Sequence, residues 1–219
     1  MSASDIMEKK RQKREKQSNI KNKLIQPFVN GFLRMNVSAN VVSFMGLSCC
    51  ILSCVFFSLG FWYMGWLRLF PPLLIFLGGL FDVIDGEVAR QSDSTSPKGA
   101  FLDWTFDRFA DGVIVIGLAL GGLISMWLGY ALLFTMFMIS FVGAKAETIG
   151  VRMQTVGWMS RGERILYVVF ALIAEHIISV YAGFSPMEVI MFAYLLLLGI
   201  TLYQRYSYVL RVIGREDRE

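Results

Sequence analysis

The sequence predicts an all-α integral membrane protein with six transmembrane helices preceded by an amphipathic helix at the membrane surface. Of its 219 residues, 55% are hydrophobic and 17% are charged, whereas soluble domains carry about 25% charged residues. Six apolar runs follow one another, and most reach the roughly 20 residues that a helix needs to cross a hydrocarbon core. They cover about Val41–Gly60, Leu69–Arg90, Gly99–Leu123, Trp127–Ala146, Ile165–Ile178 and Met187–Val209.

Basic residues divide unequally between the two sides of this predicted topology. The expected outer loops lie near residues 61–68, 122–127 and 179–186, and Arg68 is the only Lys or Arg within them. All other basic residues fall in the tails, the inner loops or the inner ends of helices. This positive-inside asymmetry predicts that both termini are cytoplasmic.

The segment before the first span divides into two parts. Residues 1–18 form a basic tail, which we expect in the cytoplasm. Residues 19–36 are predicted to form a helix that lies in the membrane surface. Apolar residues recur there at helical spacing: Ile20, Leu24, Ile25, Phe28, Val29, Phe32 and Leu33. The alternative for this segment is a disordered basic linker.

Residues 37–212 then form the predicted six-helix domain, and residues 213–219 form a second cytoplasmic tail. A basic tail also suits nucleic acid. The apolar spans that follow at once favour contact with an anionic membrane leaflet instead. We therefore expect membrane lipids, and no nucleic acid, as partners.

Carboxylates gather in the second and third runs, where a lipid-buried helix should avoid them. Asp82 and Asp85 share one helical face, and Asp103 and Asp107 share a face of the next helix. A short polar turn joins the two antiparallel helices, so both faces end at the same cytoplasmic mouth. A carboxylate at bilayer depth costs at least about 2.5–3.5 kcal/mol. Oxygen ligands without His suit Mg²⁺ or Mn²⁺, and a pair of such ions can clamp a phosphoryl group.

Small and basic residues stand between these acids. Gly86 and Ala89 leave room for a ligand on the carboxylate face, and Gly99 permits close approach to backbone. Arg90 offers a guanidinium to a phosphate. A cation-coupled carrier is the alternative, because buried carboxylates also mark ion pathways. A carrier would place its acids near the midplane with broken helices, whereas these acids lie toward one face.

The run Asp82-x2-Asp85-Gly86-x2-Ala89-Arg90-x8-Gly99-x3-Asp103-x3-Asp107 resembles the signature of the CDP-alcohol phosphotransferases, with every spacing kept. The resemblance implies an enzyme of phospholipid biosynthesis that moves a phosphoalcohol group from a CDP-linked lipid to an acceptor hydroxyl and releases CMP. It implies two ions, Mg²⁺ or Mn²⁺, held by Asp82, Asp85, Asp103 and Asp107. It also implies that Asp107 is the general base. The residues implied to bind CDP are Gly86, Ala89, Arg90 and Gly99.

Cations at the inner ends of the last three spans bear on the acceptor. Lys145, Arg164 and Arg205 could form a pocket for a second phosphate. The pattern resembles the branch that makes inositol-phosphate lipids from inositol 1-phosphate, although that branch usually has another basic residue where Gly143 stands. Glycerol 3-phosphate is the alternative acceptor. The positive-inside rule alone could also account for these cations.

The resemblance also implies a homodimer. Gly117-x3-Gly121 in the third run is a spacing that lets helices pack closely. It could serve either a contact between two copies or packing within one chain.

Overall fold

The computed structural model describes residues 24–60, 64–151, 153, 156–182 and 185–216, and all regular elements within these ranges are helical. The predicted tail at residues 1–18 and positions 19–23 of the predicted surface helix lie outside this part of the chain. A first helix covers residues 24–34. The further elements are α2 (Ala39–Ser58), the 3-10 helix η2 (Gly65–Leu69), α3 (Phe70–Gln91), α4 (Pro97–Leu120), α5 (Met126–Thr148), α6 (Arg161–Ala182) and α7 (Met187–Glu216).

The six predicted apolar runs coincide with helices α2 to α7. Five of these helices are long and apolar enough to cross a membrane, and α4 is not among them. The reason lies in its charged residues, which are Lys98, Asp103, Asp107, Arg108 and Asp111. Helix α6 starts earlier than the run Ile165–Ile178, because the backbone N–H of Ser160 donates to the Glu163 carboxylate at 2.6 Å and caps its first turn.

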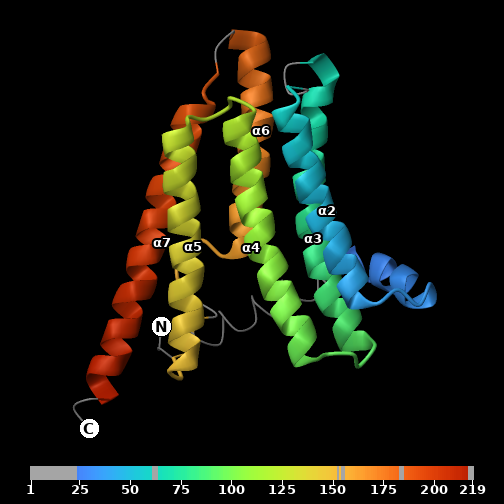
Figure 1. The fold of residues 1–219 in the computed structure, drawn as a ribbon, viewed down its shortest axis with the longest axis vertical. Coiled ribbons are helices and arrows are strands. Elements are labelled where there is room, and N and C mark those ends of the chain that lie inside the picture. The colour runs from blue at the N-terminus through green and yellow to red at the C-terminus, as the bar shows by residue number, and fades with distance from the viewer. Residues whose placement is uncertain (1–23, 61–63, 152, 154–155, 183–184, 217–219) are drawn as a thin grey trace, which may run out of the picture.

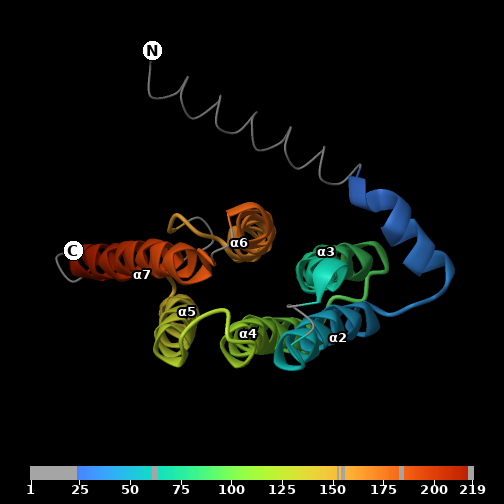
Figure 2. The same cartoon turned by 90° about the horizontal axis from the view of Figure 1, so that it is seen from above.

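The long helices form two rows, which Figure 2 shows from above. One row contains α2, α4 and α5, and the other contains α3, α6 and α7. Contacts join α2 to α3 and α4, α5 to α4 and α7, and α6 to α3 and α7. The rows therefore enclose a common interior, where a small cavity is lined by acidic residues of α3 and α4 and by Arg161.

Small residues let the helices approach closely around α2. A Cβ placed on Gly78 of α3 would lie 2.7 Å from the Cys50 sulfur of α2. A Cβ on Gly117 of α4 would lie 2.8 Å from the Cα of Cys54, and one on Gly121 would lie 3.0 Å from the carbonyl oxygen of Phe57. The Gly117-x3-Gly121 spacing thus serves packing of α4 on α2 within one chain.

The helix at residues 24–34 runs across the direction of the bundle, beside α3 (Figures 1 and 2). Its buried residues Ile25 and Val29 pack in one cluster with Val42 of α2 and with Ile84 and Val88 of α3. The apolar residues on its other faces are exposed: Leu24 is 70% and Phe28 is 55% exposed. The helix therefore has two apolar surfaces, of which one holds it against the bundle.

Candidate active site

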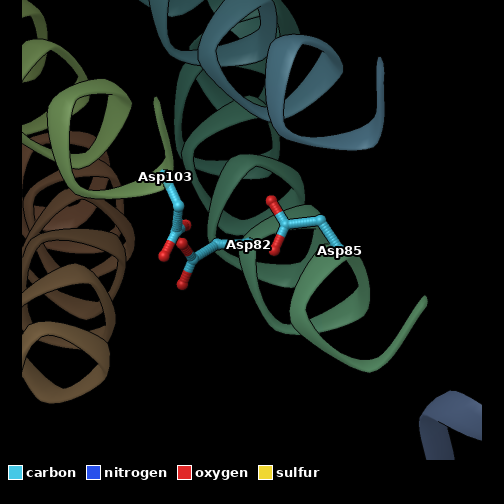
Figure 3. Close-up of side chains that lie close together, drawn as sticks. All are labelled: Asp82, Asp85 and Asp103. Atoms are coloured by element: carbon cyan, nitrogen blue, oxygen red, sulfur yellow. The ribbon is translucent and has the colours of Figure 1, made fainter. Parts of the chain in front are cut away.

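Three carboxylates from two helices come close together. Asp82 and Asp85 lie about one turn apart on α3, and Asp103 lies in the second turn of α4. One oxygen from each lies within 4.8 Å of the other two. Figure 3 shows Asp82 and Asp103 reaching toward each other, with the Asp85 carboxyl group beside Asp82. The short turn between α3 and α4 brings these residues together.

Asp85 is fixed by a residue of a third helix. The Ser43 hydroxyl on α2 donates to its Oδ2 at 2.5 Å. Asp85 is only 4% exposed, so this hydrogen bond replaces hydration that burial removes. Ser43 therefore sets the orientation of the Asp85 carboxylate.

Asp107 lies one turn after Asp103 on α4 and is paired with a cation. The Arg161 guanidinium, at the first residue of α6, lies 2.8 Å from Asp107 Oδ1 and also pairs with Asp82. Arg161 reaches this interior because α6 begins about halfway along the bundle, behind α4 (Figure 1). One guanidinium thus joins carboxylates of α3 and α4.

A second layer of charge lies deeper on α4. Arg108 lies 3.6 Å from Asp107, and its Nη1 donates to the Ser140 hydroxyl at 2.6 Å. Asp111 pairs with Arg164 of α6 at 3.2 Å, and both residues are buried. Each guanidinium thus lies beside a carboxylate, which lowers the cost of burying both charges.

A pocket of about 390 Å³ opens beside the carboxylates, toward the turn between α3 and α4. All four predicted CDP-binding residues line it together with Asp85 and Asp103. A Cβ on Gly86 would meet only the Arg90 guanidinium, at 3.8 Å. The pocket wall on this side of α3 is therefore open enough for a ligand to lie against the backbone.

Arg90 is held at the rim of this pocket by its own helix. Its guanidinium binds the Glu87 carboxylate at 2.6 and 3.0 Å. Gln91 donates to the same carboxylate and exchanges hydrogen bonds with Gln26 of the helix at residues 24–34. The first helix is thereby connected to Arg90 through a chain of polar contacts.

The three predicted acceptor cations have different surroundings. Lys145 is exposed near the end of α5. Arg164 is buried against Asp111. Arg205 of α7 donates to the carbonyl oxygens of Val156 and Ile139, both at 3.1 Å. Contacts within the described residues do not join these three side chains directly.

Gly143, which stands where the branch usually has a basic residue, leaves room for the side chain of Arg205. A Cβ there would lie 3.2 Å from Arg205 Nη1. The Arg205 guanidinium therefore lies over the position where the branch usually has a basic side chain. A cation from α7 stands at this place in the fold.

The donor atoms in the cluster fit a hard divalent cation. Asp82, Asp85 and Asp103 present only oxygen atoms as ligands. These oxygens lie close enough together for one ion to bind all three after small side-chain movements. Cys50 lines the small cavity inside the bundle together with these carboxylates, but its sulfur is not in the group of clustered ligand atoms. Oxygen ligands without sulfur or imidazole suit Mg²⁺ or Mn²⁺.

Ser43 and Arg161 are site residues that sequence reasoning did not single out. Ser43 contacts Asp85 across 42 positions of the chain, and a serine in an apolar run has many other possible roles. Arg161 stood among several cations near the inner helix ends. Its place two positions before Glu163 gave no sign that it faces Asp82 and Asp107.

A profile of the CDP-alcohol phosphatidyltransferases matches residues 36–203 of this chain. The chain belongs to this family. The match covers all the candidate metal and CDP residues, and Arg205 lies just beyond it.

Individual relatives of this chain are inositol-phosphate lipid synthases. An archaetidylinositol phosphate synthase of Methanothermobacter thermautotrophicus is 36% identical over 137 residues, which are 62% of this chain and 67% of the relative. A phosphatidylinositol phosphate synthase of Cutibacterium acnes is 32% identical over 157 residues, covering 68% of this chain and 72% of the relative.

Solved structures of the phosphatidylinositol phosphate synthase of Mycobacterium tuberculosis share the fold. The structure with CDP-DAG bound has a TM-score of 0.68 at 27% identity and covers 85% of this chain and 94% of that chain. The complex with manganese and citrate has a TM-score of 0.67 at 27% identity, with coverages of 84% and 87%.

This CDP-alcohol phosphatidyltransferase is therefore an integral membrane enzyme. It transfers a phosphatidyl-type group from a CDP-alcohol to an alcohol acceptor. Family membership decides against the cation-coupled carrier, which shared only the buried carboxylates with the transferase hypothesis. A divalent metal belongs to the site, in keeping with the carboxylate cluster and the manganese complex of the relative.

Proposed function

We propose that this enzyme transfers the phosphatidyl-type group of a CDP-linked lipid to inositol 1-phosphate, releasing CMP. The observation that carries the choice of acceptor is a set of buried guanidinium groups beside the carboxylate cluster. The names of the relatives from Methanothermobacter thermautotrophicus and Cutibacterium acnes support the same choice.

These guanidinium groups have unused hydrogen-bonding capacity. Arg164 Nε and Nη1 and Arg108 Nε are buried without a hydrogen-bond partner. The Arg205 guanidinium lies close enough to Arg108 and Arg164 for their like charges to interact. A buried unsatisfied donor costs about 1–3 kcal/mol. An acceptor phosphate would satisfy these donors and offset the repulsion, whereas a neutral alcohol would do neither. We therefore assign the acceptor phosphate to Arg164 and Arg205, with Lys145 at the outer edge.

The pocket beside Asp85 and Asp103 suits the nucleotide half of the donor. Gly86 and Gly99 leave its wall without side chains, and Ala89 adds little bulk. The Arg90 side chain is 65% exposed, so it can turn from Glu87 to a phosphate. We assign CDP to these four residues.

The chemistry needs two divalent ions, Mg²⁺ or Mn²⁺, which Asp82, Asp85, Asp103 and Asp107 would hold. When bound, such ions neutralise the diphosphate and the departing phosphate. Asp107 takes the proton of the acceptor hydroxyl as general base. The acceptor oxygen forms a bond to the β-phosphorus while the bond from that phosphorus to the bridging oxygen breaks. CMP leaves with the bridging oxygen and its electron pair.

We further propose six membrane spans, α4 included, with both termini and the site at the cytoplasmic face. Asp103, Asp107 and Asp111 of α4 line the cavity inside the bundle, so the position of α4 between α2 and α5 (Figure 2) suits a span. The exposed Leu24 and Phe28 would let the first helix lie in the membrane surface. The homodimer stays a prediction. Gly117 and Gly121 do not support it, because they pack on α2.

An acceptor comparison tests the proposed function. Purified enzyme with Mn²⁺ and CDP-diacylglycerol is given inositol 1-phosphate, glycerol 3-phosphate, inositol or serine in separate reactions, and CMP release is followed. We expect inositol 1-phosphate to react at least about tenfold faster than the others. CMP release at one rate with every acceptor, or with none, would contradict the proposal. Faster reaction with glycerol 3-phosphate would establish the alternative acceptor.

A further inference from the structure

Arg161 holds a central position among the acids of the site. It is the first residue of α6, and its side chain is only 16% exposed. Its guanidinium pairs with Asp82 of α3 and, at 2.8 Å, with Asp107 of α4. It thus forms ion pairs with one carboxylate of the metal cluster and with the carboxylate assigned as general base.

The four aspartates are not engaged equally. In the described part of the chain, no ion pair joins Asp85 or Asp103 to a basic side chain, and Asp85 is oriented by Ser43. A first cation held by Asp82, Asp85 and Asp103 would therefore compete with Arg161 at Asp82 alone. A second cation held by Asp82 and Asp107 would compete with Arg161 at both of these carboxylates.

A guanidinium and a divalent ion compete for the same carboxylate oxygens. Both are cations, and at such short separations their repulsion is screened little inside a protein. Five carboxylates line the small cavity inside the bundle, and three guanidinium groups pair with them. If all ionise and no donor is bound, two negative charges remain, which one divalent ion balances. A second ion that binds before the donor leaves an excess of positive charge unless a positive side chain moves away.

We propose that Arg161 is an exchangeable counter-cation, which holds Asp82 and Asp107 until the second divalent ion displaces it. The inference rests on the proposed two-ion site. Arg161 makes the two ion sites unequal, because the second ion binds only in competition with the guanidinium. Arg161 is thus a positioning residue for the carboxylates of Asp82 and Asp107.

Metal binding measured without turnover tests this role. Mn²⁺ is titrated into the purified enzyme and its Arg161→Gln and Arg161→Lys variants, and free Mn²⁺ is followed by electron paramagnetic resonance. Lys145→Gln is the matched control, since it removes one exposed positive charge without touching Asp82 or Asp107. Circular dichroism and the thermal unfolding midpoint show whether each variant is folded.

The wild-type enzyme should bind one Mn²⁺ tightly and one weakly. In Arg161→Gln the Kd of the weak site for Mn²⁺ should fall by about tenfold or more, because the charged hydrogen bonds of the guanidinium no longer compete with the ion. Arg161→Lys should tighten it less, because one ammonium group cannot bridge two carboxylates as well, and this variant decides if Arg161→Gln does not fold. Lys145→Gln should leave the weak site within about twofold of wild type.

Three results would overturn the inference while leaving the proposed function intact. The first is an unchanged weak site in both folded Arg161 variants. The second is weaker binding in these variants, which would make Arg161 a support of the ion site. The third is equal tightening in Lys145→Gln, which would show a general charge effect. A wild-type enzyme that binds no Mn²⁺ would overturn both the inference and the two-ion site.

Discussion

Removal of the Ser43 hydroxyl should weaken metal binding without removing a metal ligand. Ser43 donates to Asp85 Oδ2 at 2.5 Å, and hydrogen bonds to charged groups contribute about 1.5–3 kcal/mol net. Asp85 is 4% exposed, so water cannot readily replace the lost donor. Loss of a partner that orients a metal ligand typically weakens affinity about 10–100-fold. We therefore expect the Kd for the tighter Mn²⁺ ion to rise by about that factor in Ser43→Ala.

The assay is a Mn²⁺ titration of Ser43→Ala, Ser43→Thr and the control Ser48→Ala. Ser48 lies on the same helix, but its hydroxyl donates to the Phe44 carbonyl oxygen at 2.8 Å, within that helix. Ser43→Thr keeps the hydroxyl and should keep most of the affinity. The reasoning is refuted if Ser43→Ala binds Mn²⁺ as tightly as wild type, or if Ser48→Ala weakens binding equally.

Three further substitutions have definite expected outcomes. Asp107→Asn should slow CMP release about 10²–10⁴-fold while metal-dependent CDP binding by calorimetry persists; full activity would refute the base assignment. Arg205→Gln should raise the acceptor KM at least about tenfold and leave the donor KM unchanged; a fall in kcat alone would contradict its phosphate role. Gly117→Ala places a Cβ 2.8 Å from the Cα of Cys54 and should cost about 1–3 kcal/mol of stability. Thermal unfolding should detect that loss, but not in Gly199→Ala, whose Cβ meets nothing within 4 Å.

Local spacing explains why so much of the metal cluster could be predicted from the sequence. Asp82 and Asp85 lie on adjacent turns of one helix, and a short turn leads to Asp103 on the next. Helical periodicity and loop length therefore suffice to bring their carboxylates to one place. Apolar run length likewise placed α2 to α7 to within a few residues at most ends.

Contacts between distant segments could not be predicted in this way. Arg161 reaches Asp82 and Asp107 because α6 begins about halfway along the bundle. The sequence shows that Gly143 departs from the branch pattern, but only the fold shows that the Arg205 guanidinium lies over it. Helical periodicity orders residues within one helix and says nothing of which helices adjoin.

The ends of the helices show a related limit of prediction from the sequence. Hydropathy ended the last span near Val209, yet α7 continues to Glu216. A helix can leave the apolar layer without breaking, because its backbone hydrogen bonds are internal. The sequence marks where the apolar layer ends, which need not be where the helix ends.

The lipid product of a competition reaction tests the central claim most directly. Purified enzyme, Mn²⁺ and CDP-diacylglycerol are mixed with equal concentrations of inositol 1-phosphate and glycerol 3-phosphate, and the lipids formed are identified by mass spectrometry. We predict a lipid bearing an inositol phosphate head group as the main product, formed in step with CMP and formed about 10²–10⁴-fold more slowly by Asp107→Asn. A main product with a glycerol phosphate head group, or equal formation by Asp107→Asn, would contradict the account.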